Sequence, residues 1–231
     1  MGWLGRFLTS SIGQKLLMSL TGIFLILFLV VHLAGNFQLL MNDEGKAFNI
    51  YADFMSNNGL IQIISKGNFF FILLHAILGL YLWAVNKAAR GGQKYAVTKV
   101  RATNTHPGFA RNMAILGTIM LVFILIHLYQ FWLQMKLGVV ANVSYAGGPE
   151  IADLYEKVKV AFMNPGFVVF YVISMVVIAF HLWHGFQSAF QTLGLNHRKY
   201  TPFIQFLGKA YSILIPFGYA IIPIIFYLKN S

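Results

Sequence analysis

Imidazole is the only ionisable side chain found deep inside the apolar stretches of this sequence. Five of the seven histidines lie in such stretches: His32, His75, His127, His181 and His184. Between the flanking charges these stretches contain no Asp, Glu, Lys or Arg. An ionisable group is costly in hydrocarbon, so each of these histidines is expected to face a partner or a cavity inside the protein.

The chemistry that fits such a set is axial ligation of haem iron. Neutral imidazole is a good axial donor, whereas zinc sites more often recruit carboxylate or thiolate groups, and the apolar stretches contain neither. A single buried histidine is often satisfied by a hydrogen bond to a neighbouring helix, and this alternative stays open for each one. A hydrogen bond of this kind explains less well why four consecutive stretches each carry a histidine. Four ligands make two pairs, which predicts two b-type haems.

Glycine spacing indicates how the histidines pair. Gly79 follows His75 by four residues, and Gly185 follows His181 by four. Residues four apart lie on one helix face, so glycine there leaves room for a flat macrocycle bound one turn earlier. His75 and His181 are therefore expected to share one haem. By elimination, His32 and the histidine at position 127 share the other.

The remaining histidines have weaker assignments. His184 lies three residues after His181, which is favoured as the ligand because of Gly185. His184 then becomes a candidate to contact a haem propionate or a quinone, with a helix–helix hydrogen bond as the alternative. His106 and His197 lie in loops and are expected to be solvated.

Composition places these residues in a membrane protein. Only 10% of the 231 residues are charged, against about a quarter in a soluble domain. Charges almost vanish from five stretches, each able to supply the ~20 apolar residues that cross a bilayer as a helix. The sequence predicts an all-α bundle of five transmembrane helices forming one domain over residues 1–231, with spans at about 16–39, 60–87, 111–136, 165–192 and 203–228. The chain has no cysteine, which excludes thiolate-bound clusters, covalent c-type haem and disulfides within it.

Charge distribution predicts the orientation and accounts for the net charge of +11 without a nucleic-acid partner. With the N-terminus in the cytoplasm, eleven basic and no acidic residues fall inside, and the other six basic residues and all six acidic residues fall outside. This is the positive-inside pattern, and it places the C-terminus outside. Helical rise from the flanking charges then puts His32 and His127 farther from the cytoplasm than His75 and His181.

Three connecting segments carry minor expectations. Residues 1–15 are expected to lie at the membrane interface before the first span. The segment from about 40 to 58 is expected to be an outer loop. The charged stretch from Glu150 to Lys159 is expected to form a short interfacial helix.

Several ordered motifs together resemble one protein family over nearly the whole chain. They are Ser10-Ser-Ile-Gly-Gln-Lys15, Ser19-Leu-Thr-Gly22, Val31-His32-Leu-Ala-Gly-Asn36, His75-Ala-Ile-Leu-Gly79 with Trp83 and Asn86-Lys87, His127, and His181-Leu-Trp-His-Gly185-Phe-Gln-Ser188. The chain is similar to the single-chain, five-helix, dihaem cytochrome b anchor of succinate dehydrogenase and fumarate reductase. The family pairs His75 with His181 at the cytoplasmic-side haem and His32 with His127 at the outer haem, in agreement with the spacing.

The resemblance implies a function within a larger complex. A flavoprotein and an iron–sulfur subunit would dock on the cytoplasmic face of a bacterial inner membrane, and dicarboxylate chemistry would occur there rather than in this chain. Electrons from succinate would pass through both haems to a membrane quinone, with menaquinone as the expected species, in the respiratory chain and the tricarboxylic acid cycle. Fumarate reduction would reverse this path. Candidates for propionate or quinone contacts are Ser19, Asn86, Lys87, Arg90 and His184.

One departure and two alternatives remain. Some dihaem relatives carry a proton-relaying glutamate two residues before the fourth-span histidine, where this chain has Ala179. That puts a transmembrane proton path of this type in doubt. The alternatives are a cytochrome b of another respiratory complex, of the hydrogenase type, and a colourless proton-coupled transporter.

Overall fold

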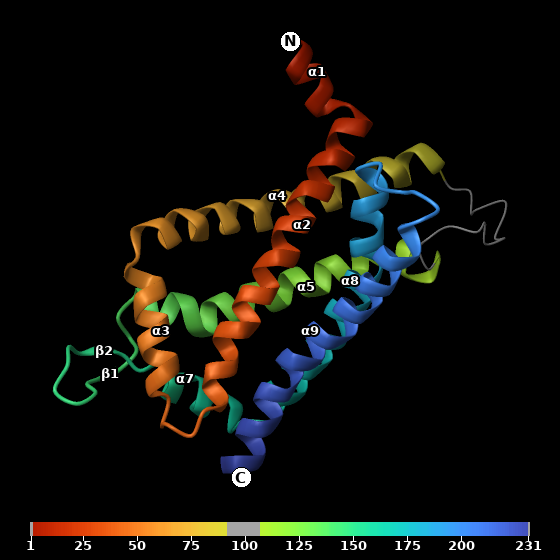
Figure 1. Ribbon diagram of the computed structural model, residues 1–231. Helices are drawn as coiled ribbons and strands as arrows, with labels where there is room; N and C mark the ends of the chain where they lie inside the picture. The colour runs from red at the N-terminus through yellow and green to blue at the C-terminus, as the bar shows by residue number, and fades with distance from the viewer. Residues whose placement is uncertain (1, 92–106, 231) are drawn as a thin grey trace.

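A computed structural model describes residues 2–91 and 107–230, and in these ranges five helices are long and apolar enough to cross a membrane (Figure 1). They are α2 (Ser11–Asn36) with the 3₁₀ turn η1 (Phe37–Leu40), α4 (Gly59–Arg90), α5 (Pro107–His127) continued by the π-helix η2 (Leu128–Leu133) and α6 (Gln134–Lys136), α8 (Pro165–Thr192) and α9 (Thr201–Asn230). The expected set of five spans is confirmed.

The four histidine-bearing helices form a closed ring. Helix α8 packs against α5 and α2, α2 packs against α4, and α4 packs against α5. Helix α9, which carries no histidine, packs beside this ring on α8 and α2 (Figure 1). The ring therefore gathers one interior histidine or more from each of its four helices.

Two glycines let α9 approach its neighbours closely. A Cβ atom at Gly218 would lie 2.8 Å from Cδ2 of Leu33 in α2, and one at Gly208 would lie 2.8 Å from Cδ1 of Phe186 in α8. Both distances are shorter than real Cβ contacts, so a side chain at either position would force its neighbour to move. Pro216 and Pro223 lie within α9, and the helix continues through both. Neighbouring groups tolerate such prolines in membrane helices.

Small elements cover one end of the bundle, where the sequence predicts mostly loops. Helix α3 (Lys46–Asn57) occupies the segment expected to be an outer loop, so that expectation is wrong. The charged stretch that begins at Glu150 does contain a helix, but this helix, α7, spans Leu154–Phe162. It starts late because β2 (Ile151–Ala152) pairs with β1 (Asn142–Val143), and Asp153 then caps α7 by accepting from the backbone N–H of Glu156.

Helix α3 has a well-defined start that explains why the segment is not a loop. The Asp43 carboxylate accepts hydrogen bonds from the backbone N–H groups of Gly45 at 3.2 Å and Ala47 at 2.8 Å. Gly45 adopts a φ of +82°, a left-handed conformation that favours glycine. The turn and the carboxylate together satisfy donors that a helix N-terminus otherwise leaves free.

The N-terminal helix α1 (Trp3–Thr9) stands apart from the bundle (Figure 1). Its apolar side chains are uncovered, with Trp3 75% exposed and Leu4 53% exposed. Exposed aromatic and aliphatic groups next to Arg6 suit the membrane–water interface. Ser10 separates α1 from α2 and caps α2 by accepting from the backbone N–H of Gly13.

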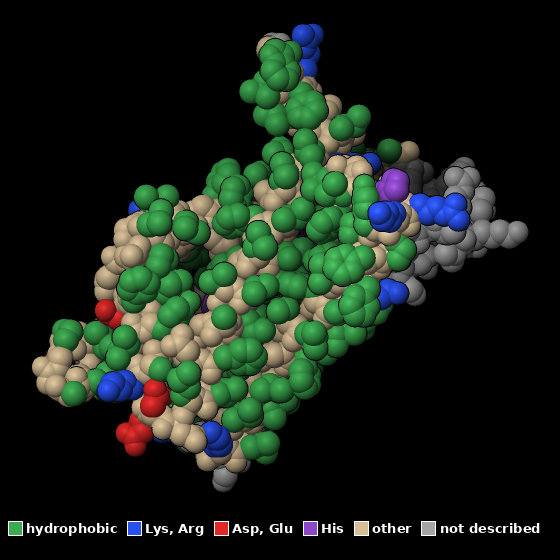
Figure 2. Space-filling view, viewed as in Figure 1, with side chains coloured by type: hydrophobic (Ala, Val, Ile, Leu, Met, Phe, Trp, Pro, Cys, Tyr) green, Lys and Arg blue, Asp and Glu red, His purple; other side chains and the backbone are tan. Residues whose placement is uncertain are grey.

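All six acidic residues lie in or beside α3, α7 and the strand pair. The acidic side chains visible in Figure 2 gather at this end. The opposite end carries the start of α2, the end of α4 and the turn between α8 and α9 (Figure 1). It includes Lys15, Lys87, Arg198 and Lys199. The charge asymmetry therefore separates the two ends of the bundle, while the side of the membrane that each end faces stays a prediction.

A fully buried amide holds the acidic end together. The Asn49 side chain of α3 is completely buried and donates to the Tyr145 hydroxyl and to Oδ1 of Asp153, each at 2.9 Å. Its own oxygen accepts from the backbone N–H of Tyr155 at 2.9 Å. One residue thereby ties α3 to the strand connection and to α7.

The orientation in the membrane can be tested with single introduced cysteines, because the native chain has no cysteine that would react. In intact cells a membrane-impermeant maleimide is expected to label Asn57→Cys, at the exposed end of α3, and not Lys199→Cys, in the α8–α9 turn. Lysed cells should label both, which controls for reactivity. The opposite pattern in intact cells would reverse the predicted topology.

Replacing the buried amide should loosen the acidic end. Asn49→Ala leaves the Tyr155 N–H without its acceptor and removes the hydrogen bonds to the Tyr145 hydroxyl and the Asp153 carboxylate, and it is expected to cost about 2–4 kcal/mol of stability. The readout is the thermal unfolding midpoint of the purified protein in detergent. Asn57→Ala is the matched control, because that exposed amide bonds only Asp53 of its own helix in the structure, at 2.9 Å. Equal midpoints for the two variants would contradict this role of Asn49.

Candidate functional site

The structure brings His75 of α4 and His181 of α8 together inside the ring of helices. Their ring centroids lie 6.3 Å apart, with 60° between the ring planes. The Thr21 hydroxyl of α2 lies 3.0 Å from Nδ1 of His75. Three of the four ring helices therefore contribute to this pair.

A second pair consists of His32 of α2 and His127 at the end of α5. Their ring centroids lie 6.0 Å apart, with 82° between the ring planes. Phe28 stacks on His32 and Phe123 stacks on His127, at centroid distances of 5.2 and 5.8 Å. The Tyr171 hydroxyl of α8 lies 3.3 Å from Nδ1 of His127. This pair sits in an aromatic, apolar shell.

Both separations fit a metal ion held between two imidazoles. A metal–nitrogen bond is about 2 Å and each nitrogen lies roughly 1.2 Å from its ring centroid, so two rings on opposite sides of one ion have centroids about 6.4 Å apart. The observed values are 6.3 and 6.0 Å. These are the pairs that the sequence predicts, and ligation itself stays a prediction.

The pairs lie at two levels of the bundle. Thr21, which contacts His75, precedes His32 by eleven residues on α2. Tyr171, which contacts His127, precedes His181 by ten residues on α8. At 1.5 Å of rise per residue the levels are about 15–17 Å apart. The level of His32 and His127 is nearer the end that carries all six acidic residues.

Two imidazole nitrogens in this region have no hydrogen-bond partner among the described residues. They are Nδ1 of His181 and Nδ1 of His184, both buried. Buried polar atoms are normally paired, so each of these is available to a group outside the chain. The role of His184 toward a propionate or a quinone stays a prediction.

The predicted glycines differ in their surroundings. A Cβ atom at Gly185 would meet nothing within 4 Å, and one at Gly79 would meet only the Met18 terminal carbon, at 3.7 Å. The space beside both glycines is thus compatible with a flat group. The closest glycine to His75 is one that sequence spacing did not single out, Gly22 of α2, where an added Cβ would lie 3.3 Å from the His75 ring.

The polar candidates at the basic end have ordinary local roles. Ser19 is buried, and its hydroxyl donates to the Lys15 carbonyl at 2.9 Å. Asn86 and Lys87 are exposed, and the Lys87 ammonium lies 5.0 Å from the centre of the Trp83 ring. The Arg90 side chain and the whole of His106 lie outside the described residues.

Sequence reasoning missed the hydroxyl partners of the histidines. Thr21 lies inside the Ser19–Gly22 motif but carried no assigned role. Tyr171 and its partner Gln130 were not singled out at all. The available signal was weak: a polar residue in an apolar stretch needs a partner, but local spacing does not say which helix supplies it.

Within residues 2–91 and 107–230, no cluster of three or more His, Asp or Glu side chains is arranged to hold a metal ion. The candidate ligands therefore occur as pairs. An ion whose other coordination positions are filled by a macrocycle needs two protein ligands, whereas a structural zinc site takes four. The donor set and its spacing fit haem.

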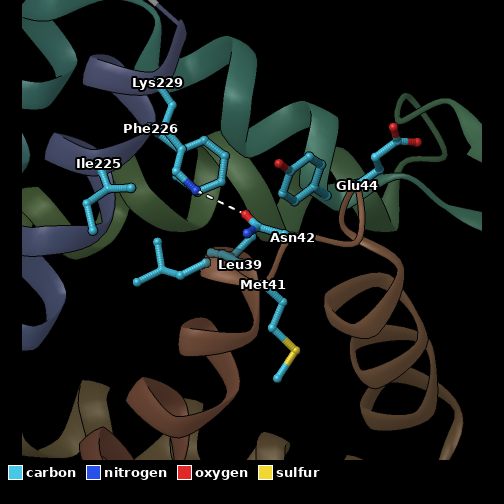
Figure 3. A pocket seen from close by; sticks show the side chains of 9 residues that line it. Leu39, Met41, Asn42, Glu44, Ile225, Phe226 and Lys229 are labelled. Atoms are coloured by element: carbon cyan, nitrogen blue, oxygen red, sulfur yellow. Dashed lines mark hydrogen bonds between the residues drawn. The ribbon is translucent and has the colours of Figure 1, made fainter.

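A separate cavity of about 390 Å³ lies at the acidic end (Figure 3). It is lined by η1 and the turn after it and by the end of α9, with Lys229 donating to the side-chain oxygen of Asn42 at 3.4 Å. Leu39, Met41 and Phe226 supply apolar walls. None of the predicted site residues lines this cavity.

Comparison with known proteins adds no assignment, since no family model, curated protein or solved structure matches the chain.

Proposed function

We propose that this chain is the membrane-anchor cytochrome b subunit of a succinate:quinone oxidoreductase, holding two b haems between His75 and His181 and between His32 and His127. One observation carries the proposal: two imidazole pairs, each with the centroid spacing of a bis-imidazole metal site, stand inside spans whose apolar interiors contain no Asp, Glu, Lys or Arg. When bound, haem supplies a reversible one-electron couple at each level.

The residues of the chain would position and insulate this couple. The four histidines supply the ligand nitrogens. Phe28, Phe123 and Phe131 cover the rings of the His32 and His127 pair and exclude water from them. Such a dry shell and the second-shell hydrogen bonds are what a protein uses to set a haem potential.

The ends of the bundle support separate contacts in this proposal. The basic end would face the cytoplasm and receive an iron–sulfur subunit and its flavoprotein, in a bacterial inner membrane. A quinone, with menaquinone as the expected species, would react from the lipid phase. The dicarboxylate site would lie in the flavoprotein.

Haem content tests the ligand assignment. Purified native protein is expected to contain about two haems b per chain by pyridine haemochrome assay, and His75→Ala and His181→Ala should each lower this to about one. His32→Ala and His127→Ala should each remove the other haem, distinguished by its reduction potential. His197→Ala, at an exposed loop histidine that stacks on Tyr200, is the control and should retain both. Fewer than one haem in the native protein would remove the proposal.

Copurification tests the complex. A tagged chain isolated from its native membrane in mild detergent should carry a covalent-flavin subunit and an iron–sulfur subunit. The double variant Arg198→Glu with Lys199→Glu, at the exposed basic end, should recover less of both, because it reverses charge where they are expected to dock. Lys46→Glu at the acidic end is the matched control and should not change recovery. Nickel in the purified complex would favour the hydrogenase-type alternative instead.

A further inference from the structure

The Tyr171 hydroxyl connects two polar groups of the neighbouring helix. It donates to Oε1 of Gln130 at 2.8 Å, which uses its single proton. The contact with Nδ1 of His127 at 3.3 Å then has the imidazole as donor and the hydroxyl oxygen as acceptor. Gln130 lies in the π-helix η2 that begins directly after His127. Such π-helical turns are frequent at functional sites.

Thr21 stands in the same relation to His75. Its hydroxyl donates to backbone carbonyls of its own helix, those of Leu17 at 2.8 Å and Met18 at 3.0 Å. Its contact with Nδ1 of His75 at 3.0 Å therefore also has the imidazole as donor. The two hydroxyls come from different helices and contact histidines at the two different levels of the bundle. Both select the tautomer that carries its proton on Nδ1.

The other member of each pair lacks such a partner. Nδ1 of His181 is buried without a hydrogen bond among the described residues. The polar group next to His32 is the Asn36 amide nitrogen, 3.3 Å from Nδ1 and 3.5 Å from Nε2. That nitrogen can only donate, and it also bonds the His32 carbonyl at 2.7 Å, so it cannot accept a proton from the ring.

We propose that Tyr171 and Thr21 are positioning residues that each fix one imidazole of a pair in the Nδ1–H tautomer, leaving Nε2 free to bind iron, while the opposite imidazole is not fixed in this way. This inference rests on the proposed haem function. An imidazole that donates through Nδ1 is a more basic ligand through Nε2. A more basic ligand favours ferric over ferrous iron, so each hydroxyl lowers the reduction potential of one haem.

Optical redox titration of the purified protein tests the assignment. Tyr171→Phe should keep two haems and raise the potential of the haem that depends on His32 and His127, leaving the other potential unchanged. Thr21→Val should raise the potential of the haem that depends on His75 and His181 and leave the other potential unchanged. Thr21→Ser, which restores a hydroxyl, should return the potential toward its native value, a rescue that a purely structural role would not require.

Tyr219→Phe is the matched control for Tyr171→Phe. The Tyr219 ring lies 5.8 Å from the His32 ring, and its hydroxyl donates to the Leu29 carbonyl at 2.7 Å rather than to an imidazole. Removing that hydroxyl should leave both potentials unchanged. Two retained haems with no shift, or a downward shift, in Tyr171→Phe and Thr21→Val would overturn the inference alone. A native protein without haem would instead overturn the proposed function.

Discussion

The cost of placing imidazole in hydrocarbon governs the arrangement of this protein. Each buried ring nitrogen needs a hydrogen bond or a metal, because no carboxylate or ammonium group stands in the apolar interior of any span to offset it. Closing α2, α4, α5 and α8 into a ring brings the histidines together as two pairs. Hydroxyls from Thr21 and Tyr171 contact two of the nitrogens, and among the described residues Nδ1 of His181 and Nδ1 of His184 have no hydrogen-bond partner.

Helix α9 shows that a span without a ligand still shapes the site. Its Tyr211 and Tyr219 hydroxyls donate to the Ile26 and Leu29 carbonyls of α2, and Gly218 lets the two helices touch at Leu33. These contacts flank the turn that precedes His32. Hydrogen bonds between helices and close packing at small residues both contribute to helix association in lipid. A helix outside the ring thus supports the segment of α2 that carries His32.

The sequence predicts the spans and the histidine pairs well because both depend on short-range regularities, charge gaps and helical period. It misses α3 because a capped, half-polar helix of this length resembles a loop in composition, and the decisive features are the Asp43 carboxylate and the φ of Gly45. It also misses Gly22, Thr21 and Tyr171 as neighbours of the histidines. Each reaches its histidine from another helix, so only tertiary packing brings it there.

The apolar interior of the spans makes histidine costly there. In the proposed function it also separates the movement of electrons from that of protons. Electron transfer between two levels about 15–17 Å apart needs no ionisable residue between them. A proton path would need a chain of exchanging groups, yet Ala179 occupies the position where some members of the proposed family carry glutamate, and Ser174 bonds only the Phe170 carbonyl of its own helix in the structure. Protons consumed or released by a quinone would therefore enter from the end of the bundle nearest that quinone, and the polar groups at the two ends, rather than the interior, would set the proton chemistry.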